Sequence, residues 1–285
     1  MAASPLPCTW RCTWPHGARP TADSPVRPRK RFGQHFLHDP AVIRRIVQAV
    51  APRADGHLVE IGPGRGALTQ LLLEAGGALD AIEIDRDLAA LLRERFVRES
   101  AFVLHEADAL DFDFTALARE RGARLRIIGN LPYNISTPLL FHLLASAAVI
   151  ADMHVMLQRE VVNRLVARPG GGDYGRLTVM LAPWVQCERL FDIGPGAFQP
   201  APRVWSAIVR LTVRPAPAFA VSPHFAQVVA AAFGHRRKTL RNALKGVVSS
   251  TLIDACKLDG GVRPETLAPE AFNILARTLD TCAEP

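Results

Sequence analysis

The chain has 285 residues, of which 49% are hydrophobic and 21% are charged, so it can bury a substantial core and form two domains. Its formal net charge of +7 and pI near 9.6 suit a polyanionic partner, although a basic surface can also serve solubility alone. The spacing of its five cysteines fits neither a disulfide framework nor a zinc ribbon, which favours a reducing cytoplasm. We expect no metal site, because prolines around Cys8, Cys12 and His16 oppose the helix that would cluster them.

Residues 1–28 contain no apolar run of the kind found in a secretory signal, and we expect them to form a disordered extension. The longest apolar stretch, Leu139 to Ala151, contains His142 and is too short to span a bilayer. We therefore interpret this stretch as an interior helix and expect a protein without membrane association.

A first helix is predicted after Asp39, which suits the N-cap position, with Pro40 at the first helical position. Apolar residues then recur at helical spacing as far as Val50, and this face is expected to cover a ligand crevice.

A strand, a glycine turn and a helix follow. The strand is His57 to Ile61, and Gly62 and Gly64 allow the backbone to approach a ligand at the start of the next helix. A second strand, Leu79 to Ile84, carries Glu83 at its end, about 20 residues past the glycines, where a carboxylate can accept ribose hydroxyls.

A third strand, Phe102 to His105, brings Asp108 to the same edge of the sheet. Gly62, Gly64 and Ala67 also fit the dinucleotide pattern G-x-G-x-x-[GA], so a nicotinamide enzyme must be considered. No proton-transfer residue for such a substrate is evident, and we favour the nucleoside cofactor S-adenosylmethionine.

The fourth strand ends in Ile128-Gly-Asn-Leu-Pro-Tyr-Asn134, which combines an amide, a rigid proline and an aromatic ring. Asn130 and the backbone of Leu131 can accept hydrogen bonds from an exocyclic amine, and Tyr133 can stack on a flat base. An ordinary strand-to-helix turn punctuated by Pro132 is the simpler alternative.

Further elements are predicted in chain order. They are a strand near His154 to Leu157, helices at Arg159 to Val166 and Arg176 to Leu181, and two late strands near Val185 to Ile193 and Val204 to Val213. The late strands are typical of the antiparallel hairpin that closes a methyltransferase sheet.

Beyond Pro215 and Pro217 the pattern becomes helical and carries a basic run. The fold class is therefore predicted as α/β, with a mostly parallel, Rossmann-like sheet over residues 29–214 and a small all-helical domain over residues 215–285, and the family resemblance given below implies a sheet of the class I methyltransferase type. We expect the RNA phosphate backbone to contact both this run and a second basic cluster, although a solvated helix face is the alternative for the run. The expected RNA contacts are Arg29, Lys30, Arg31, Arg236, Arg237, Lys238 and Arg241.

Several segments occur in the order of a known family: Arg31 to Leu37, Val59 to Gly64, Glu83 to Leu88, Asn130 to Thr137, Phe198 to Val204 and Arg263 to Leu267. Together they resemble the bacterial small-subunit (16S) rRNA adenine N6,N6-dimethyltransferases, whose relatives include 23S rRNA resistance methylases and mitochondrial transcription factor B. The resemblance covers about Arg29 to Leu279.

The resemblance implies a cofactor role for His35, Leu37, Gly62, Gly64, Glu83, Asp108 and Asn130. His35 and Leu37 would close over the cofactor, Glu83 would bind the ribose, and Asp108 would bind the adenine amine. Relatives often have glycine where Ala107 precedes Asp108. A strand-end carboxylate and a packing histidine are the simpler interpretations of Glu83 and His35.

The catalytic group implied is Asn130, Leu131, Pro132, Tyr133 and Phe198. Tyr133 and Phe198 would sandwich an adenine turned out of its RNA stack, although core packing also suits Phe198. The resemblance implies dimethylation of two adjacent adenines in a 3'-terminal hairpin loop of 16S rRNA, within the immature small ribosomal subunit, by a cytoplasmic monomer. A 23S rRNA methyltransferase, or an assembly factor with secondary catalysis, remains an alternative.

Overall fold

The computed structural model describes residues 34–53, 56–235 and 237–282. The predicted extension over residues 1–28 and the predicted RNA contacts Arg29, Lys30, Arg31 and Arg236 lie outside the described residues.

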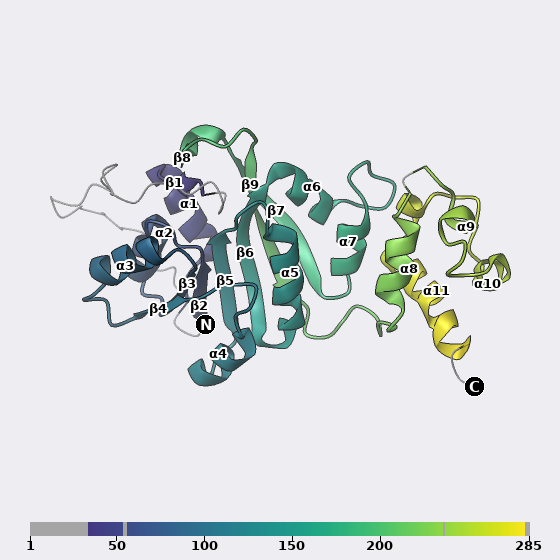
Figure 1. The fold of residues 1–285 in the computed structure, drawn as a ribbon, viewed down its shortest axis with the longest axis horizontal. Helices are drawn as coiled ribbons and strands as arrows, with labels where there is room; N and C mark the ends of the chain where they lie inside the picture. Colours follow the sequence, from purple (N-terminus) through teal and green to yellow (C-terminus); the bar gives the residue numbers. More distant parts are fainter. Residues whose placement is uncertain (1–33, 54–55, 236, 283–285) are drawn as a thin grey trace, which may run out of the picture.

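A seven-stranded sheet forms the centre of the molecule (Figure 1), with the strand order β4-β3-β2-β5-β6-β9-β7. Its strands are β2 (His57–Ile61), β3 (Leu79–Glu83), β4 (Phe102–Glu106), β5 (Leu125–Asn130), β6 (Ile150–Gln158), β7 (Val185–Ile193) and β9 (Ser206–Val213). The first five strands pair in parallel, whereas β9 pairs antiparallel with both β6 and β7. The predicted α/β class, with a mostly parallel sheet and an antiparallel closing strand, is confirmed.

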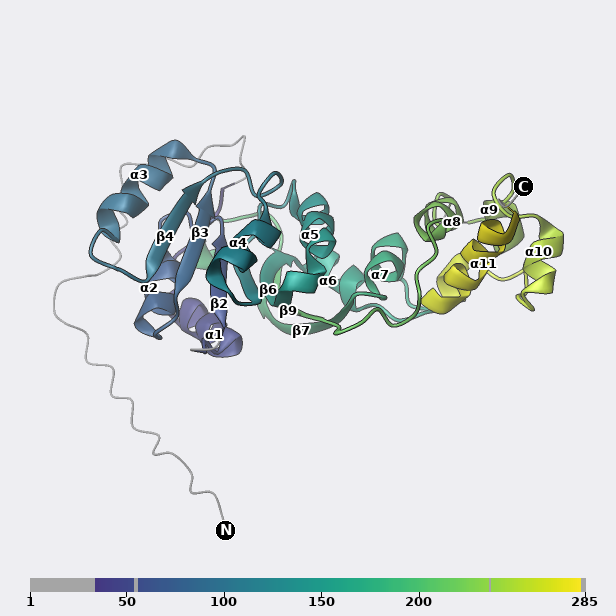
Figure 2. The ribbon, with the colours of Figure 1, turned by 90° about the horizontal axis from the view of Figure 1, so that it is seen from below.

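Helices cover both faces of this sheet (Figure 2). One face packs on α1 (Pro40–Val50) and α2 (Ala67–Glu74), and the other packs on α4 (Phe114–Arg121), α5 (Ser136–Ala145) and α6 (Arg159–Val166). The helix α3 (Arg86–Arg95) follows β3, and α7 (Arg176–Leu181) follows α6. The central strands β2, β3 and β5 are almost wholly buried because they are covered on both sides, whereas the edge strands β4 and β7 are partly exposed and carry charged residues.

The predicted start of α1 is confirmed, since the Asp39 carboxylate accepts hydrogen bonds from the backbone N–H groups of Ala41 and Val42. At the other end, the Arg126 guanidinium donates to the carbonyl oxygens of Val50 and Ala51. A cation at a helix C-terminus satisfies free carbonyls and complements the helix dipole. The helix is therefore fixed at both ends against the sheet.

The prediction of one interior helix over Leu139 to Ala151 is wrong. The helix ends at Ala145, a 3-10 turn spans Ala147–Val149, and β6 already begins at Ile150. Ile150 pairs with Leu125 of β5, so sheet pairing decides the conformation of the last residues of this run. A short apolar run does not distinguish a buried strand from a buried helix.

At one end of the molecule, α8 (Phe225–Ala232), α9 (Leu240–Ala243), α10 (Ser250–Ala255) and α11 (Pro269–Cys282) form a separate group (Figures 1 and 2). Their buried cluster also includes Tyr174 and Val179, which precede the predicted boundary at residue 215. The Tyr174 hydroxyl donates to the carbonyl oxygen of Leu267 over 2.8 Å. The domain boundary at residue 215 remains a prediction, and the core of the helical group contains residues from before and after that boundary. No helix in the described ranges has the length and apolar character needed to cross a bilayer.

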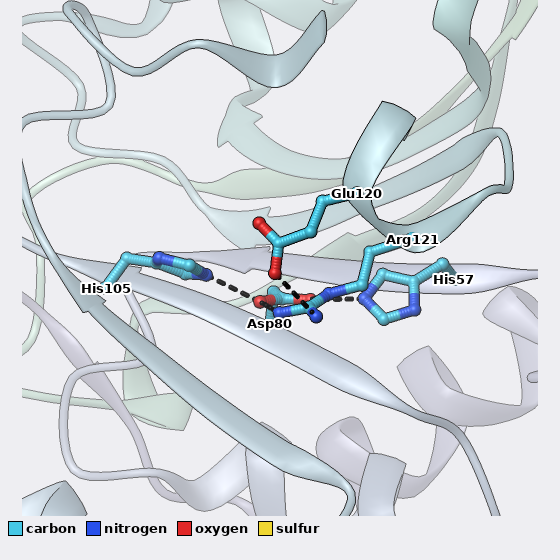
Figure 3. A network of polar contacts seen from close by, with 5 residues as sticks. All are labelled: His57, Asp80, His105, Glu120 and Arg121. Atoms are coloured by element: carbon cyan, nitrogen blue, oxygen red, sulfur yellow. Dashed lines mark hydrogen bonds and ion pairs between the residues drawn. The ribbon is translucent and has the colours of Figure 1, made fainter. Parts of the chain in front are cut away.

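The strands β2, β3 and β4 are joined to α4 by a buried carboxylate (Figure 3). Asp80 has a fully buried side chain, and it accepts hydrogen bonds from His57, His105 and Arg121. Burial alone raises the pKa of Asp80, but these three partners outweigh it and hold that pKa well below its usual range. The network lies at the start of β3, at the opposite end of that strand from Glu83.

Candidate active site

A cavity of about 90 Å³ opens where the parallel strands β2 and β5 end. Open α/β sheets bind ligands at this edge. Of the predicted site residues, the following line it: His35, Leu37, Gly62, Gly64, Asn130, Leu131, Pro132 and Tyr133. Glu83, Asp108 and Phe198 do not line it.

The glycine turn forms one wall of the cavity. Gly62 and Gly64 have φ values of 68° and 59°, in the left-handed region that a side chain disfavours. A Cβ atom at Gly64 would lie only 3.1 Å from the Phe36 ring. The turn therefore needs glycine for both its conformation and the space beside Phe36.

Glu83 ends β3 directly behind this turn. Its carboxylate accepts hydrogen bonds from the backbone N–H groups of Gly64 and Asp85, and only 5% of the residue is exposed. Burial raises the pKa of Glu83 to about 7, and these backbone hydrogen bonds only partly oppose that effect. The next residue, Ile84, is 44% exposed and offers an apolar surface beside the carboxylate.

Asp108 follows β4 at the same edge of the sheet, half-buried, outside the cavity. Its Oδ1 atom accepts the backbone N–H of Leu110 over 2.9 Å, which fixes the turn after the strand. The preceding residue, Ala107, donates its backbone N–H to the carbonyl oxygen of Glu83. The two carboxylate positions are thus joined through the backbone, and the departure from glycine at residue 107 leaves this turn intact.

The end of β5 places two hydrogen-bond acceptors at the cavity, of which the one at Leu131 belongs to a fully buried residue. The side-chain amide of Asn130 donates an N–H to the carbonyl oxygen of His35 over 2.9 Å, which leaves its Oδ1 as an acceptor. The backbone N–H of Leu131 is bonded to Met156, whereas its carbonyl oxygen has no donor among the described residues. The site therefore supplies the pair of oxygen acceptors that the sequence predicts.

Tyr133 is half-buried at the rim of this cavity. Its hydroxyl forms a hydrogen bond of 2.6 Å with the Ser206 hydroxyl at the start of β9. The imidazole of His35 stacks on the Tyr133 ring, with 5.9 Å between ring centres and 29° between planes. Nδ1 of His35 also lies 2.7 Å from the carbonyl oxygen of Pro200.

The predicted sandwich of an adenine between Tyr133 and Phe198 stays a prediction, and Phe198 lies in the core in the structure. Phe198 is 3% exposed and packs in the core with Ile193 and Ala197. It belongs to the short strand β8 (Phe198–Gln199), which pairs with β1 (Phe36–Leu37). Burial in this core stabilises the apolar Phe198 ring more than a solvent-exposed position at the cavity would. The aromatic ring that contacts Tyr133 in the structure is that of His35.

Two polar residues deep in the cavity were missed by the sequence analysis. Glu60 and His154 are each 2% exposed and flank Ile128 in one row across β2, β5 and β6. Burial raises the pKa of Glu60 to about 7, and the Thr69 hydroxyl donates to its Oε2. The nearest charged partner of His154 is the Asp152 carboxylate, 3.4 Å from Nδ1, which is too long for a well-formed hydrogen bond, and Nε2 has no partner in the described structure. Polar residues that interrupt two apolar strands were the signal in the sequence.

Some of the predicted RNA-binding residues in the helical part are exposed and others already form ion pairs. Arg237 and Lys238 are exposed, and Arg237 lines a separate cavity that also contains Arg263. Arg241 is paired with Asp254, with 3.2 Å between their atoms. The predicted contact of Arg241 with a phosphate therefore competes with an existing ion pair.

The fold and site define an α/β methyltransferase of Rossmann-like type. The family model described as "Ribosomal RNA adenine dimethylase" matches residues 26–279. This chain belongs to the ribosomal RNA adenine dimethylase family. The assignment confirms the predicted enzyme class, S-adenosylmethionine as its cofactor, and ribosomal RNA as the class of substrate.

Curated relatives agree with this assignment. Ribosomal RNA small subunit methyltransferase A of Pseudomonas aeruginosa is 55% identical over 260 residues, which cover 89% of this chain and 95% of the relative. The protein of the same name from Hahella chejuensis is 53% identical over 255 residues, covering 88% of this chain and 93% of the relative.

Solved structures share the fold. The 23S rRNA methyltransferase ErmE is 27% identical with a TM-score of 0.67, covering 86% of this chain and 99% of that one. A dimethyladenosine transferase from Plasmodium falciparum has a TM-score of 0.75 at 22% identity, covering 87% of this chain and 98% of that one, and supports the fold alone.

Proposed function

We propose that this enzyme transfers methyl groups from S-adenosylmethionine to N6 of two adjacent adenines in a 3'-terminal hairpin loop of 16S rRNA. The product is N6,N6-dimethyladenosine, made in the immature small ribosomal subunit. The observation that carries the proposal is the Asn130 amide at the end of β5, whose donor is bound by His35 and whose oxygen remains an acceptor.

The small subunit is favoured over the large one as the source of the substrate. The relatives named for the small subunit reach 55% identity, against 27% for the 23S rRNA methyltransferase. Methyltransferases for 16S and 23S rRNA need the same groups to bind an adenine amine, so the cavity does not distinguish them. The higher sequence identity to the small-subunit relatives supports this choice.

The residues present fit an adenosyl cofactor. Gly62 and Gly64 leave the turn free of side chains, and Glu83 keeps acceptor capacity at the strand end for a pair of ribose hydroxyls. Ile84 supplies an apolar surface for a base, and Asp108 lies on the same edge for the base's amine. The cavity of about 90 Å³ is smaller than a typical ligand pocket, so the nucleoside would lie along this open edge rather than inside it.

The chemistry follows from the acceptors at Asn130 and Leu131. The cofactor supplies a methyl group carried on a sulfonium. The lone pair of an adenine amine is delocalised into its ring, and hydrogen bonds to both oxygens draw the N–H groups out of the ring plane and localise that pair. Positioning and fixed dipoles then supply most of the rate, and the alkylated nitrogen releases its proton to water.

Substrate binding involves the rim and the helical part of the molecule in this proposal. Tyr133 stacks on the target adenine. The His35 ring, which now occupies that face, either moves away or stacks on the other side of the adenine. The exposed Arg237 and Lys238 contact the phosphate backbone. Residues 29–214 form the catalytic domain, residues 215–285 form the ribosome-binding domain, and the enzyme acts as a cytoplasmic monomer.

The test is direct. The protein is incubated with labelled S-adenosylmethionine and small subunits from cells that lack the modification, and the labelled nucleotides are mapped. Label at two adjacent adenines near the 3' end of 16S rRNA is the expected result. Label in 23S rRNA supplied alongside, or none in either RNA, contradicts the proposal.

A further inference from the structure

Trp205 is an exposed aromatic residue directly before β9, at the edge of the sheet where β5 and β6 end. It is 48% exposed and belongs to none of the three buried clusters of the described structure. Trp184, by contrast, packs against the core of the sheet. Trp205 directly precedes Ser206, whose hydroxyl is bonded to Tyr133 over 2.6 Å. Because successive side chains of a strand point to opposite faces, the indole lies at the same edge of the sheet as the Ser206 hydroxyl but on the face covered by α6.

Two contacts hold the indole in place. The backbone N–H of Arg159 donates to the carbonyl oxygen of Trp205 over 2.9 Å, and the Arg159 guanidinium carbon lies 5.5 Å from the centre of the indole. A Cβ atom at Gly194 would lie 3.7 Å from the indole, so this glycine lets the ring rest against the backbone. The arrangement is a cation–π pair built from β9, α6 and the end of β7.

The surroundings of this pair are positively charged. Arg159 and Arg203 are exposed, and Arg159 has no ion-pair partner in the described part of the chain. The nearby carboxylates, Glu160 and Asp192, are paired with other arginines of their own elements. The unpaired charge beside the indole is therefore positive, which suits a phosphate.

We propose that Trp205 and Arg159 form a stacking platform for an unpaired RNA base next to the adenine held at Tyr133. This inference rests on the proposed function and adds a second base to its substrate. A base stacked on the indole leaves its phosphate beside Arg159, and the RNA strand then crosses the edge of the sheet to bring the neighbouring adenine to Tyr133. An aromatic ring next to arginine is the usual platform for single-stranded RNA, and it tolerates any base.

Steady-state kinetics on a 16S rRNA hairpin test the platform. Trp205→Ala should raise the KM for the RNA roughly 5-fold or more, since losing one stacked base costs about 1 to 3 kcal/mol. The KM for S-adenosylmethionine should stay unchanged, and Trp205→Phe should recover most of the loss. Val97→Ala, at a residue 77% exposed beyond α3, is the control for removing an exposed apolar side chain. An unchanged RNA KM in Trp205→Ala overturns the platform.

Fluorescence separates this inference from the proposed methylation. The chain has four tryptophans, and unpaired RNA should quench the emission of the wild type more than that of Trp205→Phe, whereas duplex RNA should not. Quenching without methyl transfer would retain the platform and refute the proposed function. If Trp205→Ala binds the naked hairpin normally but loses affinity for whole subunits, the ring contacts a protein and the platform is refuted.

Discussion

The side-chain amide of Asn130 and the carbonyl oxygen of His35 are joined by a hydrogen bond of 2.9 Å, which ties the end of β5 to the residue before β1. This bond sets the direction of the amide. With one of its two N–H groups on His35, the amide has a fixed orientation and its oxygen is free to accept a hydrogen bond.

Replacing this amide should stop the reaction. Asn130→Ala is expected to lower kcat roughly 100- to 1,000-fold, the usual cost of removing a positioned hydrogen-bonding group from an active site, while cofactor binding weakens less. Single-turnover methylation and calorimetric titration with S-adenosylmethionine measure the two effects. Asn134→Ala removes an exposed amide of the same loop and serves as the control. Normal turnover by Asn130→Ala would refute the proposed chemistry.

Substitutions at Phe198 test whether this buried ring also contacts the substrate base. Because it is 3% exposed, Phe198→Ala should destabilise the protein by about 3 to 5 kcal/mol. The milder Phe198→Leu should keep turnover within about tenfold of the wild type. Phe272→Leu, buried in the helical cluster, gives the cost of the same change elsewhere. A hundredfold loss of turnover in a stably folded Phe198→Leu would instead show that the ring moves out to contact the base.

Cofactor binding should depend on pH through Glu83. Burial raises the pKa of Glu83 to about 7, and only the ionised carboxylate accepts both ribose hydroxyls. Affinity for S-adenosylmethionine should therefore fall as the pH drops below 7, by up to about tenfold per unit. Glu83→Gln should bind weakly with a flatter profile. Glu60→Gln removes the other carboxyl whose pKa is raised to about 7. If Glu83 causes the pH dependence of cofactor affinity, this variant should show the same dependence as the wild type.

The raised pKa of Glu83 makes the folding stability of the free protein fall as the pH rises, whereas cofactor affinity rises with pH. Between about pH 4.3, the usual pKa of an unfolded glutamate, and pH 7, the folded state binds a proton at Glu83 that the unfolded state has lost. The stability of the wild type relative to Glu83→Gln should therefore fall as the pH rises through this window. Urea denaturation at several pH values measures it, and a rise in relative stability would contradict the raised pKa.

The buried Asp80 should contribute stability with the reverse dependence. Its pKa is lowered by His105, His57 and Arg121, so its stabilisation is present above about pH 4 and is lost as the pH falls further. Asp80→Asn should cost about 3 to 5 kcal/mol at neutral pH, since it removes one side of a buried charge network. Glu160→Gln breaks an exposed ion pair and should cost about 1 kcal/mol or less. Equal losses in the two variants would refute the role of burial.

Local sequence patterns predicted much of the fold. The helices at 159–166 and 176–181 and the strands at 57–61 and 185–193 have the predicted limits, and glycines bound the strand at 57–61 on both sides. The start of β6 was missed, because pairing between Ile150 and Leu125 is not visible in a local pattern.

The site was predictable where residues are adjacent in the sequence. The acceptors at Asn130 and Leu131 follow from one strand end. The row that places Glu60 and His154 on either side of Ile128 depends on the register of three strands, and the stack of His35 on Tyr133 joins segments almost 100 residues apart. Such long-range pairings decided which aromatic ring faces Tyr133.

The Tyr174 hydroxyl donates to the Leu267 carbonyl oxygen, and the backbone N–H of Gly170 donates to the carbonyl oxygen of Glu265, so the loop over residues 170–174 holds the terminal helices in addition to the covalent linker. Cleavage of the exposed peptide at Pro215 to Pro217 would cut the linker and leave both hydrogen bonds in place. A nicked protein should therefore migrate as a single species until it is denatured.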